Sequence, residues 1–248
     1  MGNITLRAAW SGEADCLNCF LRASVLFTGL EDQDFKRIHD PIDQFAVNPG
    51  TVLYHTGDVG DYMFTVRRGT FKLVQYLPGA GRRIVRLART TDVIGLEALV
   101  EDRYAHDAIA IHHTEVCRYP ARVVHILGQE NPKLYHELMT RWRRAFSEAD
   151  TWLTELFTGS ARQRVARLLL RLVHNRVNSE YELFCREDMG AMLGITTETT
   201  SRTIAEYKRQ GLLVEVGPQC LPARCSQSAP DRRGLTENLA GIRPAHGD

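Results

Sequence analysis

A helix, a tight turn and a second helix are predicted between residues 186 and 209, and this pattern constrains the fold more than any other feature of the chain. The first helix is expected over 186–193 and the second over 197–209. Gly190 lets the two helices approach closely, and Gly194 supplies the left-handed conformation of the turn. Thr196 is a suitable N-cap for the second helix. A pair of helices of this kind is typical of proteins that place the second helix in the major groove of DNA.

The second helix of this pair carries polar side chains that suit the edges of DNA bases. Arg202 can donate two hydrogen bonds to guanine, and Glu198 can accept one from cytosine. The same two residues are one helical turn apart, so the alternative is a surface ion pair without a reading role. The two interpretations are compatible, because such a pair would hold both side chains in place. The predicted DNA-contacting residues are Thr197, Glu198, Thr199, Ser201 and Arg202.

A long amphipathic helix is predicted ahead of this segment. Asn131 and Pro132 are typical of a helix start, and neither Gly nor Pro follows before Gly159. Apolar residues recur at spacings of three and four, which is the heptad pattern of a helix that pairs with a second copy. The alternative is a helix that lies on its own core. The predicted dimer seam consists of Leu134, Leu138, Trp142, Ala145, Ala149 and Trp152.

The chain between Pro49 and Pro120 has a different sequence pattern. Short runs rich in Val, Ile, Phe, Tyr and Thr alternate with turn sequences such as Gly57-Asp58 and Arg68-Gly69. Turns at intervals of about 8–12 residues between such runs predict an antiparallel roll or sandwich. The expected strands are 51–54, 62–67, 71–77, 83–87, 107–112 and 116–119, and a short helix is expected over 32–42.

These segments together predict a fold of the α+β class. Its parts are an N-terminal antiparallel β-roll, a long dimerisation helix and a C-terminal winged helix-turn-helix. The sensor domain is expected over 1–130, the dimerisation helix over 131–158, the winged helix-turn-helix over 159–217 and an irregular tail over 218–248. The wing is expected to begin over 212–216.

The composition limits what the chain can bind and where it works. The net charge is only +1, so a surface for a polyanion has to be local. No apolar run reaches the roughly 18 residues that span a bilayer, and the first residues lack a secretory signal. We therefore expect a cytoplasmic protein without a membrane partner.

The order of these parts resembles the CRP/FNR family of bacterial regulators over roughly residues 16–216. The segment Glu198-Thr199-Thr200-Ser201-Arg202 is similar to the recognition-helix signature Glu-Thr-x-Ser-Arg of the FNR-like branch. The other matching motifs are Gly57-Asp58, Gly69-Thr70, Asp92-Val93-Ile94-Gly95 and Asn131-Pro132. The resemblance implies a homodimeric transcription activator that is not an enzyme. It also implies a cyclic-nucleotide-binding-like jelly roll, contact with RNA polymerase, and binding to double-stranded DNA at an FNR-type palindrome of the form TTGAT-N4-ATCAA.

The resemblance also bears on what the roll senses. Family members that bind cyclic AMP hold it with a Gly-Glu-Leu segment and a later Arg-Ser pair. This chain has Gly95-Leu96-Glu97 and His106-Asp107 at those places. Because an aspartate would repel the cyclic phosphate, cyclic AMP is not expected as the ligand.

Three cysteines match positions that ligate an iron–sulfur cluster in the FNR-like branch. They are Cys16 and Cys19, which form a CxxC motif, and Cys117. The fourth cysteine of the family has no counterpart, although a cluster usually takes four thiolates. The resemblance thus implies a cluster that senses oxygen or nitric oxide. The alternatives are a thiol redox or metal switch at the CxxC motif, or inert cysteines with haem, another small ligand or no ligand.

A thiol redox enzyme is the alternative from another functional class. The CxxC motif would supply its dithiol, but no βαβ pattern and no catalytic constellation accompanies the motif. The sequence therefore favours a regulator over an enzyme.

Overall fold

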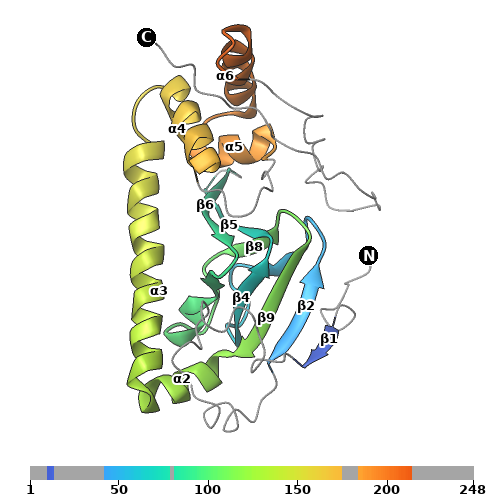
Figure 1. Ribbon diagram of the computed structural model, residues 1–248, viewed down its shortest axis with the longest axis vertical. Coiled ribbons are helices and arrows are strands. Elements are labelled where there is room, and N and C mark those ends of the chain that lie inside the picture. The colour runs from blue at the N-terminus through green and yellow to red at the C-terminus, as the bar shows by residue number, and fades with distance from the viewer. Residues whose placement is uncertain (1–9, 14–41, 79–80, 175–183, 214–248) are drawn as a thin grey trace. The chain divides into compact units, whose positions relative to one another are not determined.

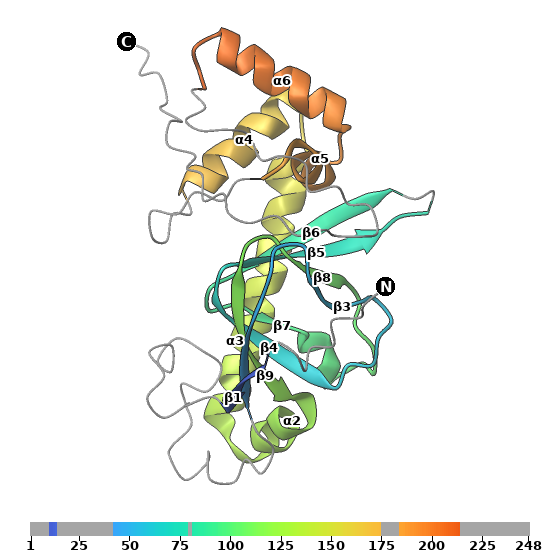
Figure 2. The same cartoon turned by 90° about the vertical axis from the view of Figure 1, so that its right-hand side faces the viewer.

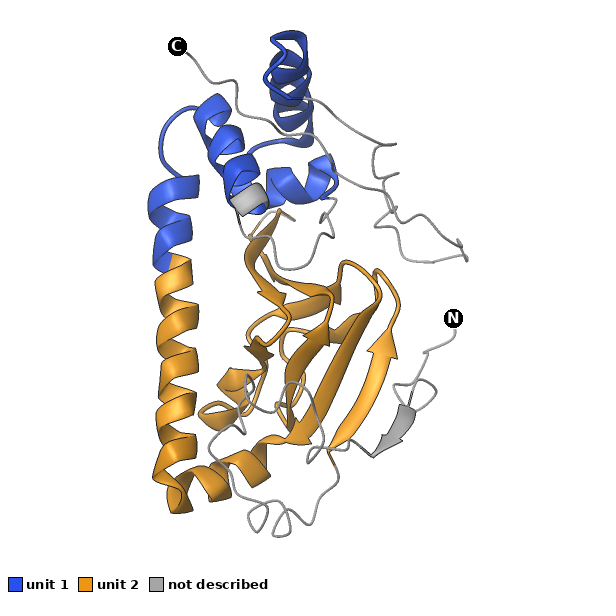
Figure 3. Ribbon diagram, viewed as in Figure 1, with its two compact units in different colours: residues 1, 150–248 blue, residues 2–149 orange. Residues whose placement is uncertain are grey.

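Two antiparallel sheets form a roll in the first of two compact units. The computed structural model describes residues 10–13, 42–78, 81–174 and 184–213. The units are residues 2–149, and residues 150–248 with residue 1 (Figure 3). The strand order is β1-β2-β9-β4-β7 in one sheet and β3-β8-β5-β6 in the other (Figures 1 and 2). The strands are β1 Trp10–Glu13, β2 Asp43–Val47, β3 Val52–Tyr54, β4 Tyr62–Arg68, β5 Thr70–Tyr76, β6 Arg82–Arg89, β7 Val93–Ile94, β8 Asp107–Ala110 and β9 Thr114–Pro120.

The predicted roll is confirmed, and its six predicted strands are all present with similar bounds. Strands β1, β2 and β7 were not predicted. In β2, Asp43, Phe45 and Val47 are buried, and the charged residue among them hides the alternation of apolar and polar positions. Asp43 can be buried there because the guanidinium of Arg118 on the neighbouring strand β9 is hydrogen-bonded to its carboxylate. The helix predicted over 32–42 lies outside the described residues except for Ile42.

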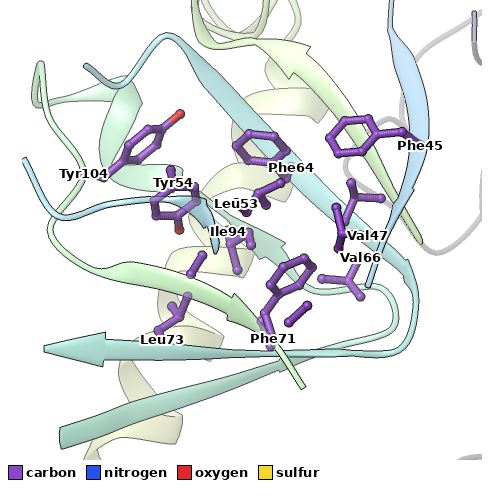
Figure 4. Packing of buried hydrophobic residues seen from close by; sticks show 14 residues of the cluster. Phe45, Val47, Leu53, Tyr54, Phe64, Val66, Phe71, Leu73, Ile94 and Tyr104 are labelled. Carbon is purple, nitrogen blue, oxygen red and sulfur yellow. The ribbon is translucent and has the colours of Figure 1, made fainter. Parts of the chain in front are cut away.

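The space between the two sheets is filled by aromatic and branched side chains (Figure 4). The ring of Tyr54 stacks on that of Tyr104, with centroids 3.9 Å apart. Removal of this apolar surface from water is the main stabilising term for the roll. The largest members of the cluster are Phe45, Leu53, Tyr54, Phe64, Phe71, Leu73, Ile94 and Tyr104.

Two helices cover the outer face of the larger sheet. They are α2 (Ala121–Glu130), which was not predicted, and α3 (Pro132–Thr151), which lies beside the roll (Figure 1). The side chain of Asn131 caps α3, because its Oδ1 accepts hydrogen bonds from the backbone N–H groups of Lys133 and Leu134 at 3.0 and 3.3 Å. A π-helical turn, η5 (Trp152–Leu156), continues α3. The cluster below these helices contains Met63, Tyr119, Val124, Leu127, Leu134 and Leu138.

The second unit contains the three helices α4 (Ala161–His174), α5 (Arg186–Leu193) and α6 (Thr197–Arg209). The bounds of α5 and α6 are those predicted from the sequence. Only Leu212 and Leu213 of the predicted wing are described, and the tail 218–248 lies outside the described residues. No helix in the described ranges is both long and apolar enough to cross a membrane. The core of this unit contains Val165, Leu168, Met189, Met192, Leu193 and Ile204.

Candidate nucleic-acid interface

The turn between α5 and α6 is built by residues close to it in the sequence. Gly194 has a φ of 66°, the left-handed conformation that the sequence predicted, and it ends α5. The side chain of Thr196 then caps α6, because its Oγ1 accepts a hydrogen bond from the N–H of Thr199 at 3.1 Å. Both ends of the turn are therefore determined by local backbone chemistry.

The two helices of the pair pack with almost no space between them at Gly190. A Cβ atom at this position would lie 2.7 Å from the carbonyl oxygen of Ile195. Thr200 of α6 is fully buried nearby, and its hydroxyl donates to the carbonyl of Thr196 at 3.1 Å. The predicted close approach at Gly190 is confirmed, and it holds the start of α6 at a defined angle to α5.

The predicted reading residues lie along the N-terminal half of α6. Thr197, Glu198, Ser201 and Arg202 are exposed. Thr199 is half-buried, and its hydroxyl lies 2.9 Å from that of Thr196, so it belongs to the helix cap as much as to the outer face. The exposed set is the end of the helix that enters a major groove in a helix-turn-helix protein.

Glu198 and Arg202 form the ion pair that the sequence allowed. Nη2 of Arg202 donates to Oε1 of Glu198 at 2.5 Å, and the two side chains are 75% and 78% exposed. An exposed pair in water contributes little to stability, about 0–1 kcal/mol. The pair therefore costs little to open, and both side chains can turn to base edges.

Helix α4 holds the far end of α6 through contacts that the sequence did not predict. The guanidinium of Arg162 donates to Glu206 Oε1 and to Gln210 Oε1, both at 2.6 Å. The hydroxyl of Tyr207 donates to the carbonyl of Arg162 at 2.7 Å. The contacting residues are about 45 positions apart in the chain, so no local sequence pattern predicts these contacts.

Positive charge gathers at the start of α5 and the end of α6. Burial lowers the pKa of Arg186, while the neighbouring Cys185 opposes this shift. Burial, and after it the charge of Arg186, lowers the pKa of Lys208. The charge of Arg186 thus reaches Lys208, which means that these two cationic side chains lie near each other.

Within the roll, hydrogen bonds surround the carboxylate of Asp107, which is at the place where the family resemblance would put a phosphate-binding residue. Burial alone would raise the pKa of Asp107, but hydrogen bonds from the Thr56 backbone, His55 and Tyr76 lower it overall. The Thr56 N–H donates to Oδ1 at 2.7 Å, the Tyr76 hydroxyl donates to Oδ2 at 3.1 Å, and Nδ1 of His55 lies 3.2 Å from Oδ2. Three donors of the roll are thus directed to a carboxylate of the chain itself.

Two family models match the chain, one in each part. The model of the cyclic nucleotide-binding domain matches residues 44–131, and that of the Crp-like helix-turn-helix domain matches residues 163–221. The chain belongs to the CRP/FNR family of transcription regulators. Members of this family that it resembles are regulators rather than enzymes, which confirms the predicted functional class.

Individual relatives of this CRP/FNR regulator are distant in sequence but similar over most of their length. The transcriptional activator protein FnrA of Stutzerimonas stutzeri is 25% identical over 214 residues, which are 84% of this chain and 88% of the relative. The transcriptional activator protein Anr of Pseudomonas aeruginosa is 23% identical over 222 residues, covering 87% and 91%. The structure of FixK2 from Bradyrhizobium japonicum has a TM-score of 0.65 at 23% identity and covers 72% of this chain and 90% of FixK2, which confirms the fold.

The structure describes one of the three cysteines matched to a cluster. Cys117 is partly exposed on β9, and its Sγ accepts a hydrogen bond from Nη1 of Arg67 at 3.6 Å. Cys16 and Cys19 lie outside the described residues. Among the residues that are described, no group of three His, Cys, Asp or Glu side chains is placed to hold a metal ion.

The apolar residues of α3 and of the following turn η5 in this CRP/FNR regulator are divided between two faces, and three residues of the predicted seam lie on the covered face. Leu134, Leu138 and Trp152 are only 0%, 5% and 4% exposed, because their own chain covers them. They have no surface left for a partner. Of the predicted seam, Trp142 and Ala149 are exposed and Ala145 is half-buried. A separate exposed stripe contains Tyr135, Met139, Trp142 and Phe146 at 56%, 44%, 37% and 71% exposure.

Proposed function

We propose that this CRP/FNR regulator works as a homodimer that binds an FNR-like palindrome and changes its DNA affinity with oxygen, nitric oxide or redox state. That it binds DNA through a Crp-like helix-turn-helix follows from the family. The dimer, the palindrome and the signal are the proposal.

The reading face of α6 is the observation that carries the choice of DNA site. Glu198, Ser201 and Arg202 are exposed together at the capped end of a helix whose angle is held at Gly190. A carboxylate and a guanidinium one turn apart suit a cytosine and a guanine in neighbouring base pairs. This set also corresponds to the FNR-like signature in the sequence.

The exposed stripe of α3 supports pairing with a second copy of this chain. Tyr135, Met139, Trp142, Phe146 and Ala149 follow one another at spacings of four and three residues. That alternation is the heptad seam of a coiled coil, and the side chains that fill it are exposed. A second α3 is a suitable occupant because it presents the same stripe, and a two-fold dimer would bring two α6 helices to two half-sites.

The surroundings of Cys117 support a response that involves thiolates. A guanidinium next to a cysteine favours the thiolate form, which is the form that binds iron and reacts with oxidants. Strand β1 ends at Glu13, which pairs with Asp43 of β2, and Asp43 pairs in turn with Arg118 of β9. Strand β1, which precedes the CxxC motif in the sequence, is therefore two strands away from β9, the strand that carries Cys117.

The three cysteines matched to a cluster fit a thiol-based response more completely than they fit a cluster with four protein ligands. Cys16, Cys19 and Cys117 would supply three thiolates to an iron–sulfur cluster, whose chemistry would be reaction with oxygen or nitric oxide. Among the described residues, Cys117 does not belong to any group of three or more His, Cys, Asp or Glu side chains that could hold a metal ion. The carboxylate at Asp107 supports a roll that does not take a cyclic phosphate as its signal.

A binding assay with purified protein tests the proposal. Protein prepared without air and protein exposed to air are titrated with the palindromic duplex and with a scrambled duplex at fixed salt. We expect a preference for the palindrome that differs between the two preparations, and a loss of this difference in Cys117→Ser. The visible spectrum and the iron and sulfide content of the airless preparation separate a cluster, haem and a colourless thiol switch.

Variants of the reading face test the assigned contacts. Glu198→Ala and Arg202→Ala should each cost about 1–3 kcal/mol on the palindrome and relax the preference at one base pair per half-site. Arg209→Ala is the matched control, because this arginine is exposed on the same helix but lies at its far end. Equal affinity of wild type for the two duplexes, or equal losses in all three variants, would contradict the assignment.

A further inference from the structure

The turn that joins β6 to β7 has a backbone conformation that needs support from its neighbours. In the described part of the chain, Thr91 is the one residue other than glycine with a positive φ, and its value is 76°. A β-branched residue in this conformation costs of the order of 1–3 kcal/mol. Hydrogen bonds hold the turn on the roll side: Thr91 N–H donates to Val66 O at 2.8 Å, and Arg89 N–H donates to Asp92 Oδ2 at 2.9 Å.

On its other side, the turn is held by α3. Nη1 of Arg141 donates to the carbonyl of Thr91 at 2.7 Å, and the Arg141 side chain is only 11% exposed. Nη2 of the same guanidinium lies 3.4 Å from Glu137 Oε1 on the preceding helical turn. Arg144 reaches Asp92 with a longer ion pair of 3.8 Å and is 63% exposed. Because charged donors form the stronger hydrogen bonds, Arg141 is the main link between α3 and this turn.

The same turn is connected through the larger sheet to the strand that carries Cys117. In the register of that sheet, Thr65 of β4 pairs with Cys117 of β9 on one side and with Val93 of β7 on the other. Val93 follows the turn directly. Beyond β7, the chain enters η4 (Leu96–Leu99), where Glu97 lies 3.6 Å from Nδ1 of His106 inside the roll. A displacement at Cys117 or at Glu97 therefore reaches Thr91 through a few residues that are paired in the sheet or adjacent in the chain.

We propose that Arg141 is the positioning residue that transmits the state of the roll to the dimer helix and so to DNA affinity. A shift of the turn moves the Thr91 carbonyl, and the guanidinium follows it. Since Arg141 is next to Trp142 in the chain, the exposed stripe of α3 moves with it. The proposal rests on the proposed function for the dimer and for the signal at the cysteines.

The test compares three variants of the full-length protein. Arg141→Ala removes the link, Arg141→Lys keeps the charge but offers a single ammonium in place of the planar guanidinium, and Arg143→Ala is the matched control. Arg143 lies two residues away on the same helix and is exposed, and its side chain forms no ion pair or hydrogen bond within the described part of the chain. For each variant, the affinity for the palindrome is measured in the airless and the air-exposed state, together with the sedimentation of the free protein.

A transmitting role predicts that Arg141→Ala remains folded and dimeric but reduces the ratio of the two affinities about fivefold or more. Arg141→Lys should recover part of this ratio, and Arg143→Ala should leave it unchanged. A residue that only stabilises the fold would lower both affinities together and leave the ratio as in wild type. That result would overturn the proposal.

Hydrogen exchange separates failure of this link from failure of the proposed function. If the DNA affinity of wild type does not depend on air, or if wild type forms no dimer, the proposed function is wrong. The link through Arg141 is then tested by the hydrogen exchange of backbone amides alone. Arg141→Ala should speed exchange at least tenfold in residues 89–94 and in residues 138–146, and Arg143→Ala should not. Unchanged exchange in both segments of Arg141→Ala would refute the link whatever the DNA assay shows.

Discussion

Truncation of Phe146 is the sharpest test of the exposed stripe on α3. Phe146 is 71% exposed. A large aromatic side chain can bury about 150–250 Å², so about 110–180 Å² of its surface is available to a partner. At about 25 cal/mol per Å², covering this surface is worth about 3–4 kcal/mol for each copy. A two-fold dimer contains the contact twice, which sets an upper limit of about 6–8 kcal/mol for the pair.

A loss of half of this binding free energy, about 3 kcal/mol, is enough to raise the dimer Kd about a hundredfold in Phe146→Ala. Sedimentation equilibrium over a range of protein concentrations measures this change directly. Ile126→Ala is the matched control, because Ile126 is 54% exposed on α2 but does not belong to the stripe. A Kd within threefold of wild type for Phe146→Ala, or an equal weakening in Ile126→Ala, would refute the assigned seam.

Two further changes test the helix pair and the roll. Gly190→Ala should lower the free energy of unfolding by about 1–3 kcal/mol and weaken DNA binding, because its Cβ would lie 2.7 Å from the Ile195 carbonyl oxygen. Urea denaturation measures the loss of stability, and an unchanged unfolding midpoint would contradict this prediction. The lowered pKa of Asp107 means that its carboxylate stabilises the fold above about pH 4, the ordinary value, and that this contribution disappears as the pH falls through the lowered pKa. The free energy of unfolding of Asp107→Asn should therefore be about 1–3 kcal/mol lower than that of wild type at pH 7, and most of this difference should disappear below the lowered pKa. An equal difference at both pH values would show that the charge of Asp107 is not involved.

The helix-turn-helix could be predicted almost residue by residue because its determinants are local. Gly194 and Thr196 act on backbone groups within a few positions of themselves, so the sequence around them contains the necessary information. The same holds for Asn131 at the start of α3. The positions of Glu198, Ser201 and Arg202 on the outer face follow once the helix bounds are known.

The parts of the roll that escaped prediction depend on residues far apart in the chain. Strand β2 contains a buried aspartate, which is acceptable only beside Arg118, 75 residues away. Likewise, the pairing of Thr65 with both Cys117 and Val93 results from the order of the strands in the sheet. Alternation and turns predict that strands exist, but they contain no information about which strands are neighbours.

From its sequence alone, this chain is a roll followed by a long helix and a DNA-binding helix pair, because each of these is specified by periodicity and capping at short range. Only the tertiary structure decided which face of α3 is free. The periodicity is compatible with a seam through Leu134 and Leu138 as well as with one through Met139 and Phe146. Packing against the sheet covers the first pair and leaves the second exposed, and a side chain that its own chain already removes from water has no apolar surface left to bury against a second helix.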